Sequence, residues 1–214
     1  LEILQDVRFQ LHLDADNLVR REQPADEVAS AAFFRPADAT DPPVEISCTG
    51  PFEFLFAGEG DAQSPDYVAT FRDNVEVWQF NPNGPSDQMT CKVLSLQFAP
   101  LGESAAGASL DTTQRQRQEL GRLKPYLLEA TGAPVIMVSP ARQIDARGSR
   151  VRITIPERKI ALDGGDVRLT SGRNVLRAPA IFYTHPAAQE RTRLGNFLAE
   201  GAGSLDFVPN PGEP

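Results

Sequence analysis

The sequence predicts an all-β protein built from antiparallel strands. Three observations predict it: apolar and polar residues alternate along most of the chain, turn-forming residues separate these stretches, and only one segment resembles a helix. That segment, residues 112–123, is rich in Gln, Arg and Glu and has a thin apolar stripe of Leu120 and Leu123. We therefore expect it to be a short helix or an exposed connector.

Length and composition exclude some classes of protein. The 214 residues are 41% hydrophobic, which is enough to bury a core without metals or disulfides. The apolar runs are far shorter than the roughly 20 residues that cross a bilayer, so a transmembrane helix is excluded. Because the chain opens at Leu1 without a basic and then apolar leader, we expect either that a leader was removed or that this is a piece of a longer chain.

The charge is divided unevenly along the chain. Residues 1–111 hold 6 Lys or Arg against 19 Asp or Glu, and residues 112–214 hold 15 against 10. One interpretation is that these charges lie on solvent-exposed strand faces. The other is that they act in binding, either by docking the two halves head to tail or by attracting an anionic ligand to the basic half. Nucleic acid is not expected as a partner, because the net charge is −8 and no basic and aromatic platform is present.

The strands of the first half carry interruptions. The alternation over 44–56 is broken at Gly50-Pro51, where we expect a bend. Asp73-Asn74 interrupt the next alternation and predict a bulge. A one-residue slip of parity before Leu94 predicts another bulge, because such a slip turns every following side chain to the other face. Residues 81–85 predict a turn.

The second half repeats this style. Residues 151–155 alternate strictly, and Asp163-Gly164-Gly165-Asp166 predict a hairpin turn between two strands. Residues 171–174 predict another turn. One more short strand is expected within 197–207, followed by a Pro-rich tail over 208–214 that we expect to be disordered.

Three blocks of the first half resemble three blocks of the second half in the same order. The pairs are 46–56 with 128–138, 68–77 with 159–169, and 88–98 with 175–185. Incomplete units stand at both ends, over 4–11 and 197–207. Such self-similarity predicts a stacked β architecture whose sheet edges are open at both ends.

The blocks LEATGAPVIMV, ARGSRVRITIPERKIALDGGDVRL and NVLRAPAIFYTH resemble the OstA-like family of lipopolysaccharide-transport proteins, which includes LptA and LptC. The resemblance covers about 46–98 and 122–207, and neither the insert 14–43 nor the connector 99–121 has a counterpart in it. The matching residues are small or glycine positions, hairpin positions and terminal aromatics: Ala130, Leu162, Gly165, Val167, Leu169, Ala178 and Tyr183, with Phe71, Asn74, Val75, Cys91 and Phe98 in the first half.

The resemblance implies a fold, a function and partners. The fold is a β-jellyroll, taco-like, with an apolar trough between its lips and units at 1–98 and 122–207. The function is non-enzymatic: a lipid-binding component of a periplasmic bridge that carries lipopolysaccharide or another acylated glycolipid to the outer membrane. The partners are other OstA-like domains, joined head to tail through edge strands. Whether a membrane anchor precedes Leu1 is left open by the resemblance. The alternative is a structural cell-envelope scaffold or interaction module without a lipid.

Two groups of residues are candidates for a site. The apolar strand faces line either a lipid groove or a closed core. The groove candidates are Phe52, Phe54, Phe56, Phe71, Val135, Met137, Ile153, Ile155, Leu169 and Tyr183. Cys48 and Cys91 are either two buried free thiols or one disulfide, which needs Cα atoms within about 7 Å.

Catalysis, cofactors and metals are not expected. His12 and His185 are the two histidines, and no nucleophile, zinc or P-loop motif accompanies them. The cluster Asp14-Asp16-Asn17 lacks the glycine and the distal glutamate of an EF-hand loop. The sequence therefore points to a binding protein or a scaffold.

Overall fold

The computed structural model of the protein describes residues 2–3, 7–11, 44–56, 67–80, 84–100, 123–184 and 196–208. Within these ranges the chain forms twelve strands and one short 3-10 turn, η2 (Pro140–Arg142), so the all-β prediction is confirmed. In chain order the strands are β1 (Glu2–Ile3), β2 (Val7–Leu11), β3 (Val44–Cys48), β4 (Phe52–Phe56), β5 (Tyr67–Gln79), β6 (Asp87–Pro100), β7 (Leu123–Ser139), β8 (Ile144–Thr154), β9 (Lys159–Ser171), β10 (Asn174–Thr184), β11 (Asn196–Glu200) and β12 (Ser204–Asp206).

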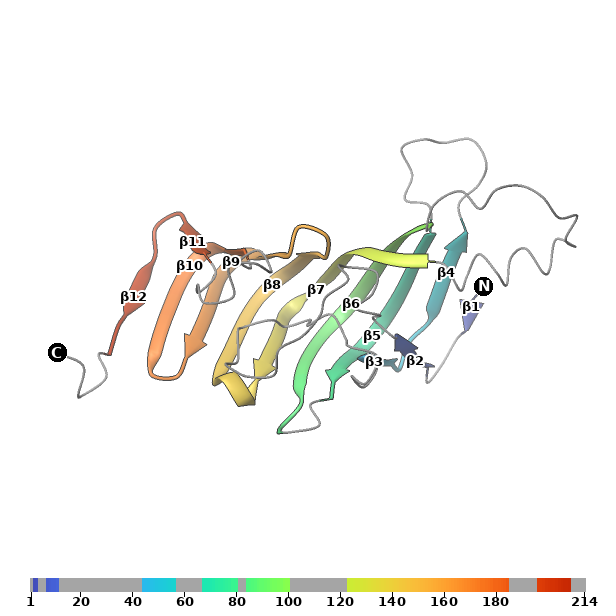
Figure 1. Cartoon of the computed structure of the whole chain (residues 1–214), viewed down its shortest axis with the longest axis horizontal. Helices are drawn as coiled ribbons and strands as arrows, with labels where there is room; N and C mark the ends of the chain where they lie inside the picture. Colours follow the sequence, from blue (N-terminus) through green and yellow to red (C-terminus); the bar gives the residue numbers. More distant parts are fainter. Residues whose placement is uncertain are drawn as a thin grey trace, which may run out of the picture.

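All described strands belong to one antiparallel sheet, and from β4 to β11 they lie in chain order (Figure 1). At the N-terminal end two short strands share one neighbour, since β3 and β4 both pair with β5. The C-terminal end is built the same way, because β11 and β12 both pair with β10. The described strands β1, β2, β11 and β12 have no second partner strand, so the predicted open edges are present at both ends.

Every long strand bends at the same level of the sheet. The register slips between Arg72 and Val75 in β5, and each following strand slips where it passes that level. The later slips fall between Thr90 and Val93, Thr131 and Val135, Arg147 and Arg150, Asp163 and Val167, and Ala178 and Ala180. These positions are neighbours across strands, and they form one line along the sheet, which we call the bend line. A bulged strand bends and twists locally.

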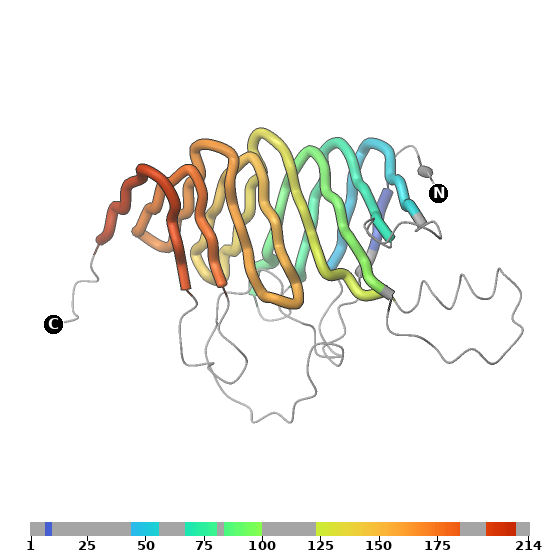
Figure 2. Tube along the Cα trace, turned by 90° about the horizontal axis from the view of Figure 1, so that it is seen from above, coloured from blue at the N-terminus to red at the C-terminus, as the bar shows by residue number. Residues whose placement is uncertain are grey.

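The bend line folds the sheet into two facing arms. Figure 2 shows each long strand passing as an arch over a common ridge. We call the two sides the β3 arm and the β4 arm after the short strands that define them. The β3 arm comprises β2, β3, 75–79, 87–91, 135–139, 144–147, 167–171, 174–178 and β12. The β4 arm comprises β1, β4, 67–72, 93–100, 123–131, 150–154, 159–163, 180–184 and β11.

Four sequence predictions concern these irregularities and are confirmed. The chain breaks between β3 and β4 at Gly50-Pro51, the Asp73-Asn74 bulge lies in β5, and the slip before Leu94 lies in β6. The turn over 171–174 joins β9 to β10, with Asn174 paired to Ser171. The hairpin predicted at 163–166 is wrong. The two glycines there have φ of 103° and 105° and bend the single strand β9 without reversing it.

The residues that the two halves share mark positions on the bend line, whereas the strands that carry the matching blocks do not correspond one to one. Block 46–56 lies in β3 and β4, and block 128–138 lies in β7, which runs in the opposite direction because three antiparallel steps separate β4 from β7. Strand β8 stands between two blocks of the second half and has no counterpart in the first. The shared Thr-Gly and Pro therefore mark the place where a strand crosses the ridge.

Several predictions fall outside the described residues or at their border. The insert 14–43, both histidines and the turn residues 81–83 lie outside them. So does the candidate helix, apart from Leu123, which begins β7. The single strand expected within 197–207 is two strands, separated at residues 201–203. In the segment predicted to be a disordered tail, the described Val208 donates its backbone N–H to Asn174 Oδ1 at 2.9 Å.

Candidate functional site

The inner faces of the two arms carry one continuous apolar surface. In the β3 arm the row Ile46, Val77, Met89, Met137 and Ala146 is 2% exposed or less. In the β4 arm the row nearest the ridge is 6% exposed or less and runs across seven strands. That row consists of Phe52, Phe71, Leu94, Ala130, Val151, Leu162 and Ile181. Two facing apolar surfaces form the core of the molecule.

The structure brings most of the predicted groove residues onto this inner face. Seven of them are buried, namely Phe52, Phe54, Phe71, Val135, Met137, Ile153 and Tyr183. Ile155 and Leu169 are partly buried and pack against the same core. Phe56 ends β4, and its side chain lies outside the described residues. Between β3 and β10 the burial of these residues is that of a filled interior, and their role in a lipid groove stays a prediction.

The inner face becomes exposed at its C-terminal end. Phe197 of β11 pairs with Tyr183, and the two rings lie 4.4 Å apart between centroids, yet Phe197 is 53% exposed. On the other arm Leu205 of β12 pairs with Leu176 and is 63% exposed, and Phe207 follows at 67%. No described strand covers this end. An apolar surface thus continues from the core into solvent.

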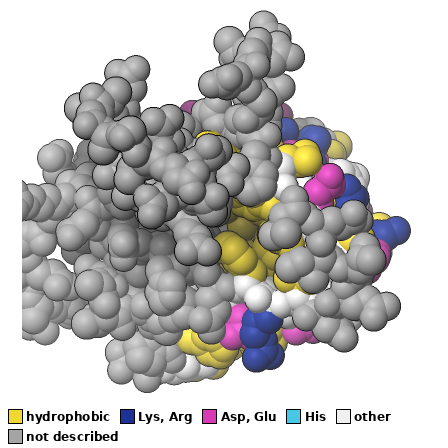
Figure 3. Space-filling view, turned by 90° about the vertical axis from the view of Figure 1, so that its right-hand side faces the viewer, with side chains coloured by type: hydrophobic (Ala, Val, Ile, Leu, Met, Phe, Trp, Pro, Cys, Tyr) yellow, Lys and Arg dark blue, Asp and Glu magenta, His cyan; other side chains and the backbone are white. Residues whose placement is uncertain are grey.

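The N-terminal end is closed by aromatic rings. Phe9 of the β3 arm meets two phenylalanines of the β4 arm, Phe52 at 6.3 Å and Phe71 at 5.8 Å between ring centroids. Phe54 adds contacts with Tyr67 and Phe98. Figure 3 looks at this end and shows hydrophobic side chains at the centre with charged side chains around them. The two ends of the interior therefore differ.

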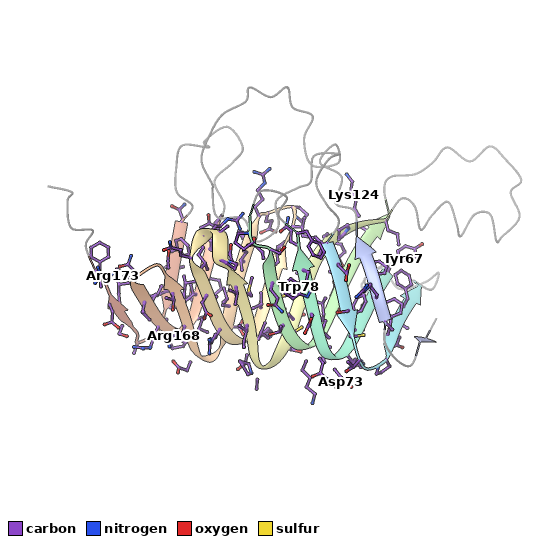
Figure 4. The ribbon with its side chains drawn as sticks, turned by 90° about the horizontal axis from the view of Figure 1, so that it is seen from below. Tyr67, Asp73, Trp78, Lys124, Arg168 and Arg173 are labelled. Atoms are coloured by element: carbon purple, nitrogen blue, oxygen red, sulfur yellow. The ribbon has the colours of Figure 1, made fainter. Side chains whose placement is uncertain are left out.

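The two rims of the fold differ in chemistry. The β3 arm ends in polar residues on its inner face, with Gln79, Asp87 and Ser139 on three adjacent strands. The β4 arm ends in aromatic residues, because Tyr67 pairs with Phe98 near its rim. In Figure 4, Lys124 and Tyr67 lie on the rim side of the molecule, whereas Asp73 lies on the ridge side. The space between the arms is thus bordered by one polar and one aromatic rim.

The two cysteines are free and buried, so the disulfide alternative is not realised. Ser47 pairs with Glu76, which places Cys48 beside Val75, and Val75 pairs with Cys91. One strand separates the two thiols, and two strand spacings amount to about 10 Å. Burial raises the pKa of Cys91 to about 12 and also raises the pKa of Cys48, so both stay protonated and unreactive at neutral pH.

The outer face of the second half carries arginines with carboxylate partners. Arg150 contacts Asp163 through two donors, Nε at 2.9 Å and Nη2 at 3.0 Å. Arg152 donates to Glu129 at 3.2 Å, and Arg147 donates to Asp145 at 3.1 Å on its own strand. These hydrogen bonds raise the pKa of Arg147 and Arg150. The described basic residues of this half therefore lie mainly on a solvated outer face.

Sequence reasoning missed the residues at the ends and rims. Phe9, Phe197 and Leu205 sit at inner-face positions of the end strands. The polar neighbours on both sides of Phe9 and of Leu205 were a usable signal. Gln79 and Ser139 continue the inward parity of Val75-Val77 and Val135-Met137, and a polar residue at the end of an apolar row marks a rim.

Two classes of site are not found in the part of the chain that the structure describes. No group of three His, Cys, Asp or Glu side chains there could hold a metal ion. No described helix has the length and hydropathy to span a membrane.

No family model matches the sequence, and no curated protein matches it. Among solved structures the chain is similar to the crystal structure of LptH, the LptA homologous periplasmic component of the conserved lipopolysaccharide transport device from Pseudomonas aeruginosa. The identity is 13% and the TM-score 0.40, over 74% of this chain and 95% of that chain. At this identity the function has to be inferred from the residues of this chain.

Proposed function

We propose that the protein is a non-enzymatic, lipid-binding component of a periplasmic bridge that carries lipopolysaccharide or a related acylated glycolipid toward the outer membrane. The observation that carries the proposal is the inner apolar face, which runs through the whole sheet and emerges at the C-terminal end as Phe197, Leu205 and Phe207. Burying an acyl chain against such a surface gains about 0.8 kcal/mol per methylene. The sequence blocks that resemble the OstA-like family support the same function.

Acyl-chain binding is tested at the exposed end, where a charge does not disturb the core. Phe197→Asp and Leu205→Asp place a carboxylate on the inner face, so binding of an acylated glycolipid should fall at least tenfold. Leu198→Asp is the matched control, since Leu198 is 56% exposed on the same strand but faces outward. Native mass spectrometry of freshly purified protein measures co-purifying lipid. Equal lipid loss in all three variants, or no lipid in the wild type, contradicts the proposal.

Assembly belongs to the same proposal. The unpaired edges at β1–β2 and β11–β12 can add strands of another OstA-like domain. A head-to-tail contact does not close on itself, so open oligomers are expected. On the N-terminal edge Arg8 is paired with Glu45, and on the C-terminal edge Asp206 is paired with Arg177, so backbone pairing rather than charge is what the edges offer. Light scattering should show mass rising with protein concentration. A monomer at all concentrations contradicts this part.

A second candidate function is a structural scaffold of the cell envelope without a lipid. One observation favours it: the inner face between β3 and β10 is filled, with Phe71, Ala130 and Val151 fully buried. A scaffold retains concentration-dependent assembly and shows no bound lipid. The two experiments above therefore separate the candidates. Under either candidate function, the division into units 1–98 and 122–207, joined by 99–121, stays a proposal. Strands β6 and β7 pair across this division, so the sheet is continuous there.

A further inference from the structure

Two buried polar atoms without a hydrogen-bond partner occur among the described residues, Gln79 Oε1 and Ser139 Oγ. Both lie in one row at the rim of the β3 arm. Gln79 pairs with Asp87, and the pairing of Gln88 with Val138 places Asp87 beside Ser139. The unpartnered atoms thus flank one aspartate, on the strands to either side of it.

The aspartate between them is held by an arginine. Arg142 of η2 donates from Nη1 to Asp87 Oδ2 at 2.9 Å, and the two side chains are 18% and 13% exposed. Ser139 is fully buried and immediately precedes η2. The next row inward is apolar and includes Met89 and Met137. A compact polar group therefore borders the apolar interior at this rim.

Unpartnered buried polar groups are costly and rare, and a bound water or ligand usually accounts for them. An amide oxygen accepts hydrogen bonds, and a serine hydroxyl both donates and accepts. Their complement is a group rich in hydroxyl or amide N–H. The adjoining apolar row and the aromatic rim opposite suit the chain of the same molecule. Together they suit an amphiphile with a sugar head.

We infer that Gln79, Ser139 and the Asp87–Arg142 pair form the head-group subsite for an acylated sugar whose chain lies between the arms once they part, since Met89 and Met137 below the subsite are 2% exposed or less. The inference rests on the proposed lipid-binding function and adds to it the place and chemistry of the head. Gln79 Oε1 accepts a hydrogen bond from a sugar hydroxyl or amide, and Ser139 Oγ forms a hydrogen bond with a second such group. The Asp87–Arg142 ion pair fixes the orientation of the head.

The test compares two probes with the same chain below their micelle concentrations. Dodecyl maltoside has a hydroxyl-rich head, and dodecyltrimethylammonium has a head without hydrogen-bond donors. Calorimetric titration of the full chain should show that Gln79→Leu and Ser139→Ala each weaken maltoside binding about fivefold, the loss expected for one hydrogen bond. Binding of dodecyltrimethylammonium should stay within twofold, and the melting temperature should stay equal or rise.

Ser95→Ala is the control, because Ser95 pairs with Glu129 and Thr70 on the outer face. It should change neither affinity. If maltoside binds and the two rim variants bind it as the wild type does, the head-group subsite is wrong and lipid binding stands. If both variants lose both probes and melt earlier, the rim residues are structural and the subsite is again wrong. If neither probe binds the wild type, the proposed function fails and the subsite fails with it.

Discussion

Phe9 and Phe52 come from opposite arms of the folded sheet and stack with an angle of 25° between their rings. With Phe71 they join the arms at the N-terminal end, while the C-terminal end leaves Phe197 and Leu205 in solvent. The interior is therefore closed at one end by aromatic contacts and open at the other.

Removing the ring of Phe9 should loosen the closed end. We expect Phe9→Ala to lower the free energy of unfolding by about 2 kcal/mol, less than the ~3–5 kcal/mol of a fully buried phenylalanine, because Phe9 is half-buried. Urea denaturation measures the change. Phe207→Ala, at a site 67% exposed, should shift it by less than about 0.5 kcal/mol. Equal effects of the two substitutions would show that the ring does not join the arms.

The bend line should be sensitive to steric change at Gly164. A Cβ there would lie 2.5 Å from Ser149 Cβ, whereas a Cβ on Gly165 would meet nothing within 4 Å. Both residues have positive φ, so Gly165→Ala should cost about 1–2 kcal/mol from backbone strain alone. Gly164→Ala should cost a further 1–3 kcal/mol, an approximate range for forced packing. Thermal unfolding of both variants measures the difference, and a cost at Gly164 no greater than at Gly165 contradicts the close contact.

The buried thiol of Cys91 should make stability fall at alkaline pH. Its pKa is raised from 9.0 to about 12, so the unfolded chain releases the proton at lower pH than the folded chain does. The stabilisation is full below pH 9 and declines as the pH rises toward 12. Between pH 8 and 10 the wild type should lose about 1 kcal/mol more than Cys91→Ala does. Parallel denaturation curves for the two proteins would overturn this reading of the thiol.

The Arg150–Asp163 pair should contribute little to stability despite its two short hydrogen bonds. The two side chains are 46% and 26% exposed, and solvent screens such pairs. A double-mutant cycle with Arg150→Ala and Asp163→Ala should give a coupling below about 1 kcal/mol that decreases with salt. A coupling above about 2 kcal/mol would mean that the pair helps to hold the bend.

The local features of the fold were predictable because they are written in neighbouring residues. Alternation predicted the strands, and Gly50-Pro51, Asp73-Asn74 and the parity slip before Leu94 predicted bends and bulges. The hairpin prediction at Asp163-Gly164-Gly165-Asp166 was wrong, because two glycines with positive φ suit a hairpin turn and a sharp bend equally. Only pairing with β8 and β10 on both sides of those glycines keeps the strand going in one direction.

The sequence by itself indicated which residues face inward within each described strand segment between two bends, because side chains on a strand alternate with period 2. Tertiary structure alone decided that the irregularities of the long strands align into one ridge, because alignment depends on register between strands that are distant in sequence. It also decided that Gln79, Asp87 and Ser139 meet at one rim and that Cys48 and Cys91 stay apart. These relations depend on which strands pair with each other, and the alternation of residues within one strand does not indicate its pairing partner.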